Sequence, residues 1–216
     1  MLIIEQIFLV GINEKSKKIW FDWKEYLFYG AILIDLVLKE KISITKDLNP
    51  DRKSSTTRLI IEILNKDSTN NTILDKMLQF IESNGEKNSL TEVLFKFVKR
   101  SNYSEFREVL ISNFESKGLI QYLGKKKFKR KYQATEPGIK TKILDEINAV
   151  IFDNQEPTKE LTFLLSLLNI EYNIRKLIPR KSVKIAEERI LKLLEDDVIG
   201  WQVQSVITDM IISLED

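Results

Sequence analysis

The strongest chemical signal in the sequence is a run of basic residues between Gly124 and Gln133, which reads GKKKFKRKYQ. No acidic residue follows these cations before Glu136, so their charges can act together on an anionic partner. Near an anionic bilayer each basic side chain contributes about 1 kcal/mol of attraction. The run therefore favours contact with a charged membrane surface through Lys125, Lys126, Lys127, Lys129, Arg130 and Lys131.

A second candidate is Trp20, which follows the basic turn Lys15–Lys18 and precedes a long apolar segment. A tryptophan suits an interface, because one side of its ring can be apolar while the other stays wet. The aromatic residues that come after it recur at helical spacing, which is typical of a protein core. We therefore predict that Trp20 is an interfacial anchor and that its aromatic neighbours are mostly buried.

The residue types that are missing exclude several classes of chemistry. The 216 residues include neither histidine nor cysteine, so the Ser-His-Asp triad, the cysteine nucleophile, the zinc finger and thiol redox chemistry are all excluded. The spacing of the glycines matches neither a phosphate-binding loop nor a dinucleotide-binding turn. We predict a protein that is not an enzyme, with no catalytic residues, no cofactor and no metal, although a hard cation on oxygen ligands stays chemically permitted.

The net charge does not identify a class of binding partner. Lys and Arg number 34 against 32 Asp and Glu, which leaves a formal net charge of +2. This excess is too small to indicate a nucleic-acid binder, so the arrangement of the charges must decide. No apolar stretch reaches the ~20 residues that a membrane span needs, and no secretory signal is recognisable at the start. We expect a cytoplasmic protein that lies peripherally on the cytoplasmic face of a membrane.

The elements that must position these residues are predicted to be mostly helical. The segment from Lys24 to Lys39 is apolar on nearly all sides, which predicts a helix at the centre of the fold. Leu2–Ile12 is predicted as a short apolar helix or strand. We expect one compact, mainly α domain over residues 1–216, with a central buried helix and one or two small β-hairpins. Further helices are predicted at 72–83, 90–100, 104–117, 137–152, 158–177, 182–194 and 201–214.

Two segments break the helical period and alternate instead. Ile42 and Ile44 are predicted to pair with Leu59–Leu64 around the turn at 49–51. Leu119–Leu123 and Phe128–Gln133 flank the lysine run and predict a second hairpin. Gly118, just before this hairpin, is the residue type expected one position past a helix end.

The same residues allow other functions. The helix 104–117, a glycine turn and a basic hairpin also resemble a winged-helix nucleic-acid binder, in which Arg107 and the hairpin lysines would contact phosphates. Against this, acidic residues outnumber basic ones on that helix, so it would enter a groove against its own charge. A protein-docking adaptor is a third hypothesis, for which the sequence offers no anchor. A purely structural hairpin, whose lysines prevent edge-to-edge aggregation, is a fourth.

Several segments, in this order, resemble the Golgi phosphoprotein 3 family of phosphoinositide effectors, and the last one is similar to its bacterial members. The resemblance covers essentially the whole chain. Its segments are LIIEQIFLVGI, Trp20–Asp22, YGAILIDLVLKEKISI, RKSSTTR, FREVLISNFESKGLI with the following hairpin, and IRKLIPRKSVKIAEERILKLL.

This resemblance implies an almost all-helical, non-enzymatic domain that binds phosphatidylinositol 4-phosphate, with Trp20 and Arg107 at headgroup-binding positions. Two further arginine positions of the family's headgroup site fall on Tyr29 and Ser104, which carry no positive charge. Eukaryotic members have an apolar strand where this chain has KFKRKY, so we expect electrostatic adhesion here in place of insertion. The implied partners are anionic membrane lipids, the tails of membrane proteins and a second copy of the chain, whereas nucleic acid is not expected.

Overall fold

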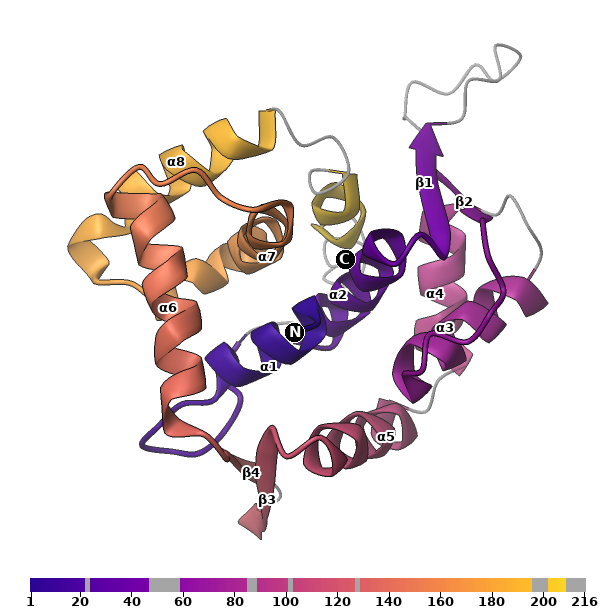
Figure 1. The fold of residues 1–216 in the computed structure, drawn as a ribbon, viewed down its shortest axis with the longest axis horizontal. Helices are drawn as coiled ribbons and strands as arrows, with labels where there is room; N and C mark the ends of the chain where they lie inside the picture. Colours follow the sequence, from indigo (N-terminus) through magenta and orange to yellow (C-terminus); the bar gives the residue numbers. More distant parts are fainter. Residues whose placement is uncertain are drawn as a thin grey trace.

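The computed structural model describes residues 1–21, 24–46, 59–84, 89–100, 103–126, 129–195 and 202–208. Helices make up most of the fold, and two antiparallel sheets of two strands each lie at its periphery (Figure 1). The prediction of a mainly α fold with small hairpins is therefore confirmed.

Two helices form the centre of the molecule. The apolar start of the chain is the helix α1 (Ile3–Gly11), and α2 (Lys24–Leu38) packs against it as the predicted central helix. Leu27, Ile32 and Leu36 of α2 are completely buried. The packing is close at Gly30, where an added Cβ would overlap the side chain of Ile207 and lie 2.9 Å from that of Leu167, so both side chains would have to move to admit a larger residue.

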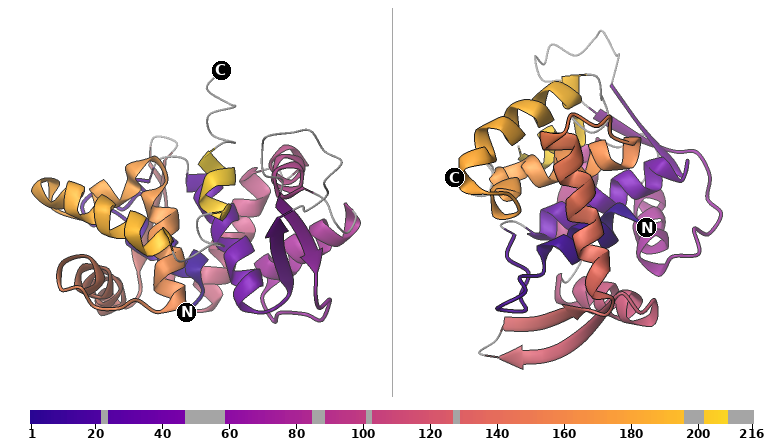
Figure 2. Two further views of the ribbon diagram at one scale, coloured as in Figure 1. Left: turned by 90° about the horizontal axis from the view of Figure 1, so that it is seen from above. Right: turned by 60° about the vertical axis from the view of Figure 1, so that its left-hand side comes forward.

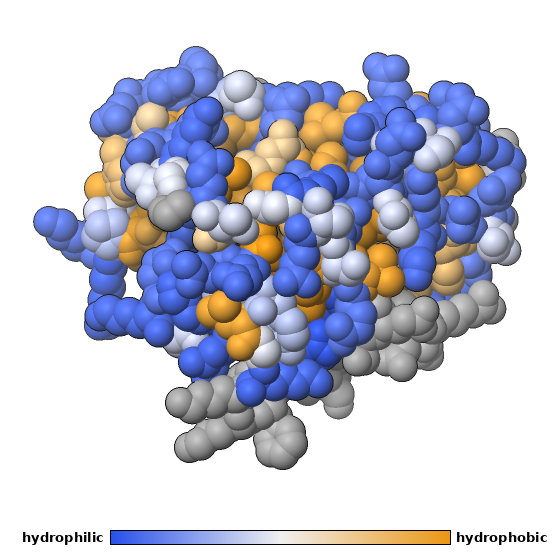
Figure 3. All heavy atoms as spheres, turned by 60° about the horizontal axis from the view of Figure 1, so that its bottom comes forward, coloured by the Kyte–Doolittle hydropathy of each residue, from blue (hydrophilic) through white to orange (hydrophobic). Residues whose placement is uncertain are grey.

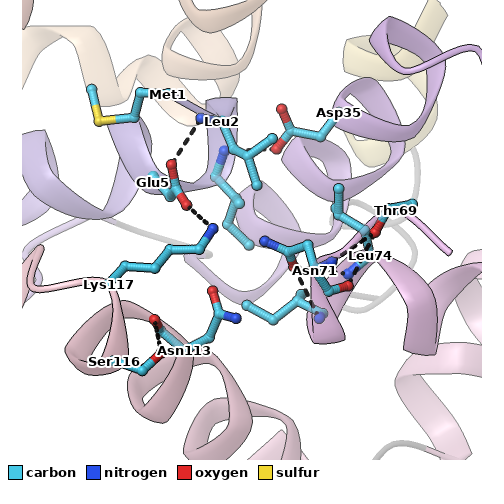
Figure 4. A network of polar contacts seen from close by, with 12 residues as sticks. Met1, Leu2, Glu5, Asp35, Thr69, Asn71, Leu74, Asn113, Ser116 and Lys117 are labelled. Carbon is cyan, nitrogen blue, oxygen red and sulfur yellow. Dashed lines mark hydrogen bonds and ion pairs between the residues drawn. The ribbon is translucent and has the colours of Figure 1, made fainter.

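Polar side chains fix the start of α1 (Figure 4). The carboxylate of Asp35, on α2, accepts hydrogen bonds from the backbone amides of Ile3 (2.8 Å) and Ile4 (3.1 Å). Glu5 accepts one from the amide of Leu2 (2.9 Å) and forms an ion pair with Lys117 (2.7 Å). These bonds satisfy amides that a helix N-terminus leaves without intrahelical partners.

The first hairpin contributes the side chains of one face to the core. Its strands β1 (Ile42–Lys46) and β2 (Leu59–Ile63) pair as predicted, with Ile44 opposite Ile61, whereas the predicted turn at 49–51 lies outside the described residues. The helices α3 (Thr72–Ser83) and α4 (Leu90–Arg100) follow it and match their predicted bounds.

The second hairpin follows a helix that ends as predicted. The helix α5 (Tyr103–Ser116) is closed by Gly118 at a φ of 64°, and the amide of Leu119 donates to the carbonyl of Phe114 (2.9 Å). The strands β3 (Ile120–Lys126) and β4 (Lys129–Ala134) then pair, with a shift of register between Tyr122 and Lys125. Gly124 lies within this shift at a φ of 84°, a conformation that glycine adopts at little cost.

The C-terminal part of the chain returns over the central helices (Figure 2). The helices α6 (Pro137–Phe152) and α8 (Val183–Glu195) lie close to their predicted positions. Residues 202–208 are helical, and the rest of the predicted helix 201–214 lies outside the described residues.

The prediction of one continuous helix over residues 158–177 is wrong. The segment 158–177 divides into α7 (Lys159–Asn169) and the 3₁₀ helix η1 (Ile170–Lys176), and a second 3₁₀ turn, η2 (Arg180–Ser182), precedes α8. Ile170 leaves the helical region with a ψ of 130°, which lets both Ile170 and Ile174 be buried. The buried Asn173 side chain donates to the carbonyl of Ile170 (2.8 Å), so the break leaves that carbonyl satisfied.

Candidate anionic-surface site

The turn before Trp20 is folded tightly by its own polar groups. The side-chain oxygen of Asn13 accepts hydrogen bonds from the amides of Lys15 (3.1 Å) and Ser16 (2.8 Å), and Lys18 accepts at its carbonyl from the amide of Asn13 (2.8 Å). Lys17 adopts a left-handed φ of 59° to complete the turn. We call residues 12–20 the Trp20 loop; Lys15 is exposed, and Lys17 and Lys18 are partly exposed.

Trp20 lies at the end of this loop with 38% of its surface exposed. Its amide donates to the carbonyl of Gly11 (3.1 Å), and its carbonyl accepts from the ammonium of Lys176 on η1 (2.9 Å). The backbone of Trp20 is therefore held from both sides while its side chain reaches solvent, which is the placement expected of an interfacial anchor.

The Trp20 loop is joined to the second hairpin. The amide of Tyr132, on β4, donates to the carbonyl of Lys17 (2.7 Å), so the loop lies beside β4 (Figure 2). From α6, Lys140 donates to the carbonyl of Ile12 and lies 3.4 Å from Glu14, and its burial lowers the pKa of its ammonium group. The structure thus brings two basic segments together that are more than 100 residues apart in the sequence.

The basic residues of the hairpin do not share one environment. Lys125 is exposed and Lys131 is partly exposed. The backbones of Lys126 and Lys129 face each other in the strand register, and Lys127 lies outside the described residues. Arg130 and Tyr132 lie on the same face of β4, because alternate residues of a strand face the same side. This face is buried, and the two residues have exposed fractions of 9% and 4%.

Arg130 lies against α5. Its guanidinium forms a hydrogen-bonded ion pair with Glu108 and lies 5.8 Å from the ring centroid of Tyr122. The hydrogen bond from Arg130 lowers the pKa of the Glu108 carboxyl and raises the pKa of the guanidinium. Arg130 was predicted to meet a membrane together with the lysines of the run, but in the structure it is buried against α5 and paired with Glu108.

Arg107 lies in the same neighbourhood, partly buried on α5. Burial raises the pKa of Tyr132 to about 12, and the charges of Arg130 and Arg107 oppose this rise. Arg107 also acts on Glu108, whose pKa it helps to lower. Tyr132 therefore lies between the Trp20 loop and Arg107. Its amide donates a hydrogen bond to the loop, and the charge of Arg107 acts on its phenol.

The other two predicted headgroup residues differ from these. Tyr29 is buried at 2% exposure, and its ring centroid lies 5.1 Å from those of both Phe97 and Phe106. Its ring therefore contributes to the aromatic core, and a contact with a lipid stays a prediction. Ser104 lies on α5, but its side chain is outside the described set, so its predicted role is untested.

The face that carries the hairpin is mainly hydrophilic, with smaller apolar areas between its polar residues (Figure 3). Within the described ranges, no cluster of three or more acidic side chains is placed to hold a metal ion. Likewise, no described helix has the length and apolarity that crossing a bilayer requires.

Sequence reasoning missed the residues that fix the Trp20 loop from outside. Lys140 and Lys176 contact its backbone from α6 and η1. Both are single lysines on helical segments, where a solvated charge is the usual interpretation, so no local signal distinguishes them. The basic turn at 15–18 was visible in the sequence, but its pairing with β4 was not.

Comparison with protein families identifies a relationship over most of the chain. The family model described as Golgi phosphoprotein 3 matches residues 3–210, which is nearly the whole chain, while no curated protein matches. The match includes the Trp20 loop, α5 and the second hairpin, which are the parts that form the site described above. By this match the chain belongs to the Golgi phosphoprotein 3 family.

Proposed function

We propose that this chain is a non-enzymatic peripheral membrane protein that binds anionic lipid headgroups, phosphatidylinositol 4-phosphate among them. Membership of an adaptor family supports this function. The observation that carries it is the hydrogen bond between Tyr132 and Lys17 (2.7 Å), which joins the exposed Trp20 and its basic turn to the basic hairpin. An apolar anchor beside fixed cations is what adhesion to a charged bilayer requires.

The charges at this face are sufficient for reversible binding. Lys15, Lys17 and Lys18 on the loop and Lys125 and Lys131 on the hairpin are exposed or partly exposed. At about 1 kcal/mol for each residue that reaches the surface, they supply several kcal/mol as an upper figure. This attraction acts within a Debye length of ~8 Å at physiological ionic strength, so binding will weaken as salt is added.

Co-sedimentation with vesicles tests the proposal. The vesicles contain phosphatidylcholine alone, phosphatidylcholine with phosphatidylserine, or phosphatidylcholine with phosphatidylinositol 4-phosphate. Neutralising Lys125 and Lys131 together (K125Q/K131Q) removes up to about 2 kcal/mol, so we expect affinity for anionic vesicles to fall by up to about 30-fold. Trp20→Ala should weaken binding to every anionic vesicle, because the apolar anchor is lost.

The matched control is K184Q/K192Q, which removes the same charge from the exposed side chains of α8, away from the hairpin (Figure 1). We expect it to bind vesicles as the native chain does. Equal losses in the two double variants would contradict a localised site, as would binding that is indifferent to salt. Binding to duplex DNA with a steep salt slope, and none to vesicles, would replace the proposal with the nucleic-acid alternative.

The cytoplasmic membrane face is the location proposed for this function. Membrane-protein tails and a second copy of the chain are its proposed additional partners. The vesicle assay addresses the lipids alone, and analytical ultracentrifugation would test self-association.

A further inference from the structure

The segment between α7 and α8 carries a second group of basic residues. Arg180 and Lys181 belong to the turn η2, Lys184 follows in the first turn of α8, and no acidic residue occurs from 172 to 186. Arg180 and Lys181 are exposed, and neither takes part in an ion pair within the described part of the chain. Lys184 lies 3.8 Å from Glu188, so its charge is balanced within α8. The unbalanced positive charge of the segment is therefore that of Arg180 and Lys181.

An exposed apolar side chain accompanies these two cations. Ile185, in the first turn of α8, has 56% of its surface exposed. Single exposed apolar residues are common on proteins, so Ile185 is informative only together with its neighbours. An apolar residue beside unbalanced cations is the combination that the Trp20 loop also presents, and it is the one that adhesion to an anionic bilayer requires. We call residues 180–185 the η2 corner.

The η2 corner is held in place by the core on both of its sides. Ile178 precedes it with an exposed fraction of 7%, and Ala186, which follows it, is completely buried. The amide of Ser182 donates to the carbonyl of Pro179 (2.8 Å) and closes the turn. Because both ends of the corner are fixed, it presents its exposed side chains to a partner without first having to order its backbone.

The η2 corner and the second hairpin are both joined to the Trp20 loop. Lys176 of η1, four residues before the corner, donates to the carbonyl of Trp20 (2.9 Å), while Tyr132 of β4 donates to the carbonyl of Lys17 (2.7 Å). Figures 1 and 2 show the loop between the hairpin and the segment that joins α7 to α8, along one edge of the molecule. Three basic segments that are far apart in the sequence therefore share this edge.

We infer that the η2 corner, through Arg180, Lys181 and Ile185, is a further membrane contact, so that the chain lies on an anionic bilayer along the edge formed by the hairpin, the Trp20 loop and this corner. The inference rests on the proposed function and adds an orientation to it. Arg180 and Lys181 are exposed on a turn, so they attract the negative surface charge of any lipid and select no headgroup. Because the three contacts belong to one folded domain, binding through one of them brings the others close to the surface.

The first test measures affinity for vesicles of phosphatidylcholine with phosphatidylserine. R180Q/K181Q removes two cations that would reach the surface, so we expect affinity to fall by up to about 30-fold. The control K184Q/K192Q removes the same charge from α8 but leaves the cations of the η2 corner in place, and it should bind as the native chain does. Unchanged affinity in R180Q/K181Q would overturn the inference and leave the corner to an acidic segment of a protein partner.

The second test detects the contact directly. The chain contains no cysteine, so one introduced cysteine can be labelled specifically with a dye whose emission shifts to shorter wavelength when it leaves water. The dye is placed at Ile185→Cys in the corner, at Leu123→Cys in β3, or at Leu64→Cys directly after β2. Leu64 is the matched control, because it is apolar and 57% exposed like Ile185 but belongs to the other side of the molecule (Figure 1). We expect the same vesicles to shift the emission at 185 and 123 and to leave it unchanged at 64.

These positions separate the inference from the proposed function. If the dye at 123 responds and the dye at 185 does not, the hairpin binds the membrane without the corner, so the inference is overturned while the proposed function stands. If no position responds and no variant sediments with vesicles, the proposed function itself fails, and the inference fails with it. Equal responses at 185 and 64 would indicate adsorption without a fixed orientation and would also overturn the inference. Circular dichroism and thermal unfolding establish that each variant is folded before it is compared.

Discussion

The two hairpins have the same topology and both contribute to the core, but they differ in the side chains that they bury. In the first, Ile42, Ile44 and Ile61 are at most 5% exposed and belong to the main core. In the second, the buried face of β4 carries Arg130 and Tyr132, and Lys131 between them is partly exposed. Both pair two antiparallel strands directly. Side-chain chemistry, and not the pairing itself, therefore decides whether such a hairpin stabilises the core or presents charge to a partner.

The two hairpins also differ in how they contact the neighbouring helices. The first hairpin contacts α2 and α4, and apolar residues of these helices such as Leu36 and Leu94 are buried. The second hairpin forms polar bonds to α5, where Glu108 pairs with Arg130 and Glu115 accepts from the amide of Tyr122 (2.9 Å). Its Tyr132 ring also lies 5.1 Å from the ring of Phe8 in the core. Replacing residues in the first hairpin should thus change the stability of the whole domain, and replacing residues in the second should change binding.

The largest effect is expected from Ile61→Ala in β2. Ile61 is 1% exposed opposite Ile44, so its truncation removes buried methyl groups and leaves a cavity. We expect the free energy of unfolding to fall by about 2–5 kcal/mol in chemical denaturation. Glu62→Ala, on the exposed face of the same strand, should cost less than about 0.5 kcal/mol. Similar losses in both variants would show that this hairpin is not part of the core.

A smaller effect is expected on the pH dependence of stability, which should differ between the buried carboxyl of Asp35 on α2 and the exposed carboxyl of Glu108 on α5. Burial raises the pKa of Asp35 to about 7, while the hydrogen bonds from Ile3 and Ile4 oppose this rise. The unfolded chain releases this proton near pH 4, about where a free aspartate titrates. The folded state then binds more protons between these values, so the contribution of Asp35 to stability decreases as pH rises from about 4 to about 7.

Asp35→Asn tests this pH dependence. We expect the variant to gain up to about 4 kcal/mol relative to the native chain between pH 4 and pH 8, because the amide cannot ionise. Glu108→Gln provides the contrast. The pKa of Glu108 is lowered by Arg130, so its stabilising pair is present above the usual glutamate range and is lost as pH falls. A constant difference between Asp35→Asn and the native chain across this range would contradict the raised pKa.

The smallest effect is expected from Gly124→Ala. Gly124 has a φ of 84° with open space around it, so an alanine there meets no clash and suffers only an unfavourable backbone conformation. We expect a cost of about 1–2 kcal/mol, confined to β3 and β4 and visible as faster amide hydrogen exchange in that hairpin. Gly138→Ala is the control, since it also has open space but an ordinary φ in the first turn of α6, and it should be neutral or slightly stabilising. Unchanged exchange in Gly124→Ala would show that the register shift does not depend on glycine.

Much of the fold was predictable because it depends on local signals. The all-round apolar pattern of 24–39 predicted α2, and Gly118 predicted the end of α5, since both follow from residues adjacent in the chain. The break at Ile170 was not predictable in this way. Its residues continue a helical pattern, and the burial of Ile170 and Ile174 against other elements is what favours the 3₁₀ turn.

The candidate site was predictable in part. The basic run and Trp20 were visible because charge and aromatic type are properties of single residues. The burial of Arg130 against Glu108 was not predictable from the sequence. The alternation of side chains along β4 shows which residues share a face, but it does not show which face the rest of the protein covers. The roles of Lys140 and Lys176 were hidden for the same reason, as each contacts a loop that begins far away in the sequence.

The sequence by itself determined which residue types are absent, most of the helical segments and the two hairpins. These follow from composition and from spacing over a few residues. Only the tertiary structure decided that the Trp20 loop lies beside β4 through Tyr132 and Lys17, and that one cation of the basic run is separated from the others. The physical reason is that such contacts depend on which surfaces are buried together when the helices pack, and that burial is a property of the whole chain.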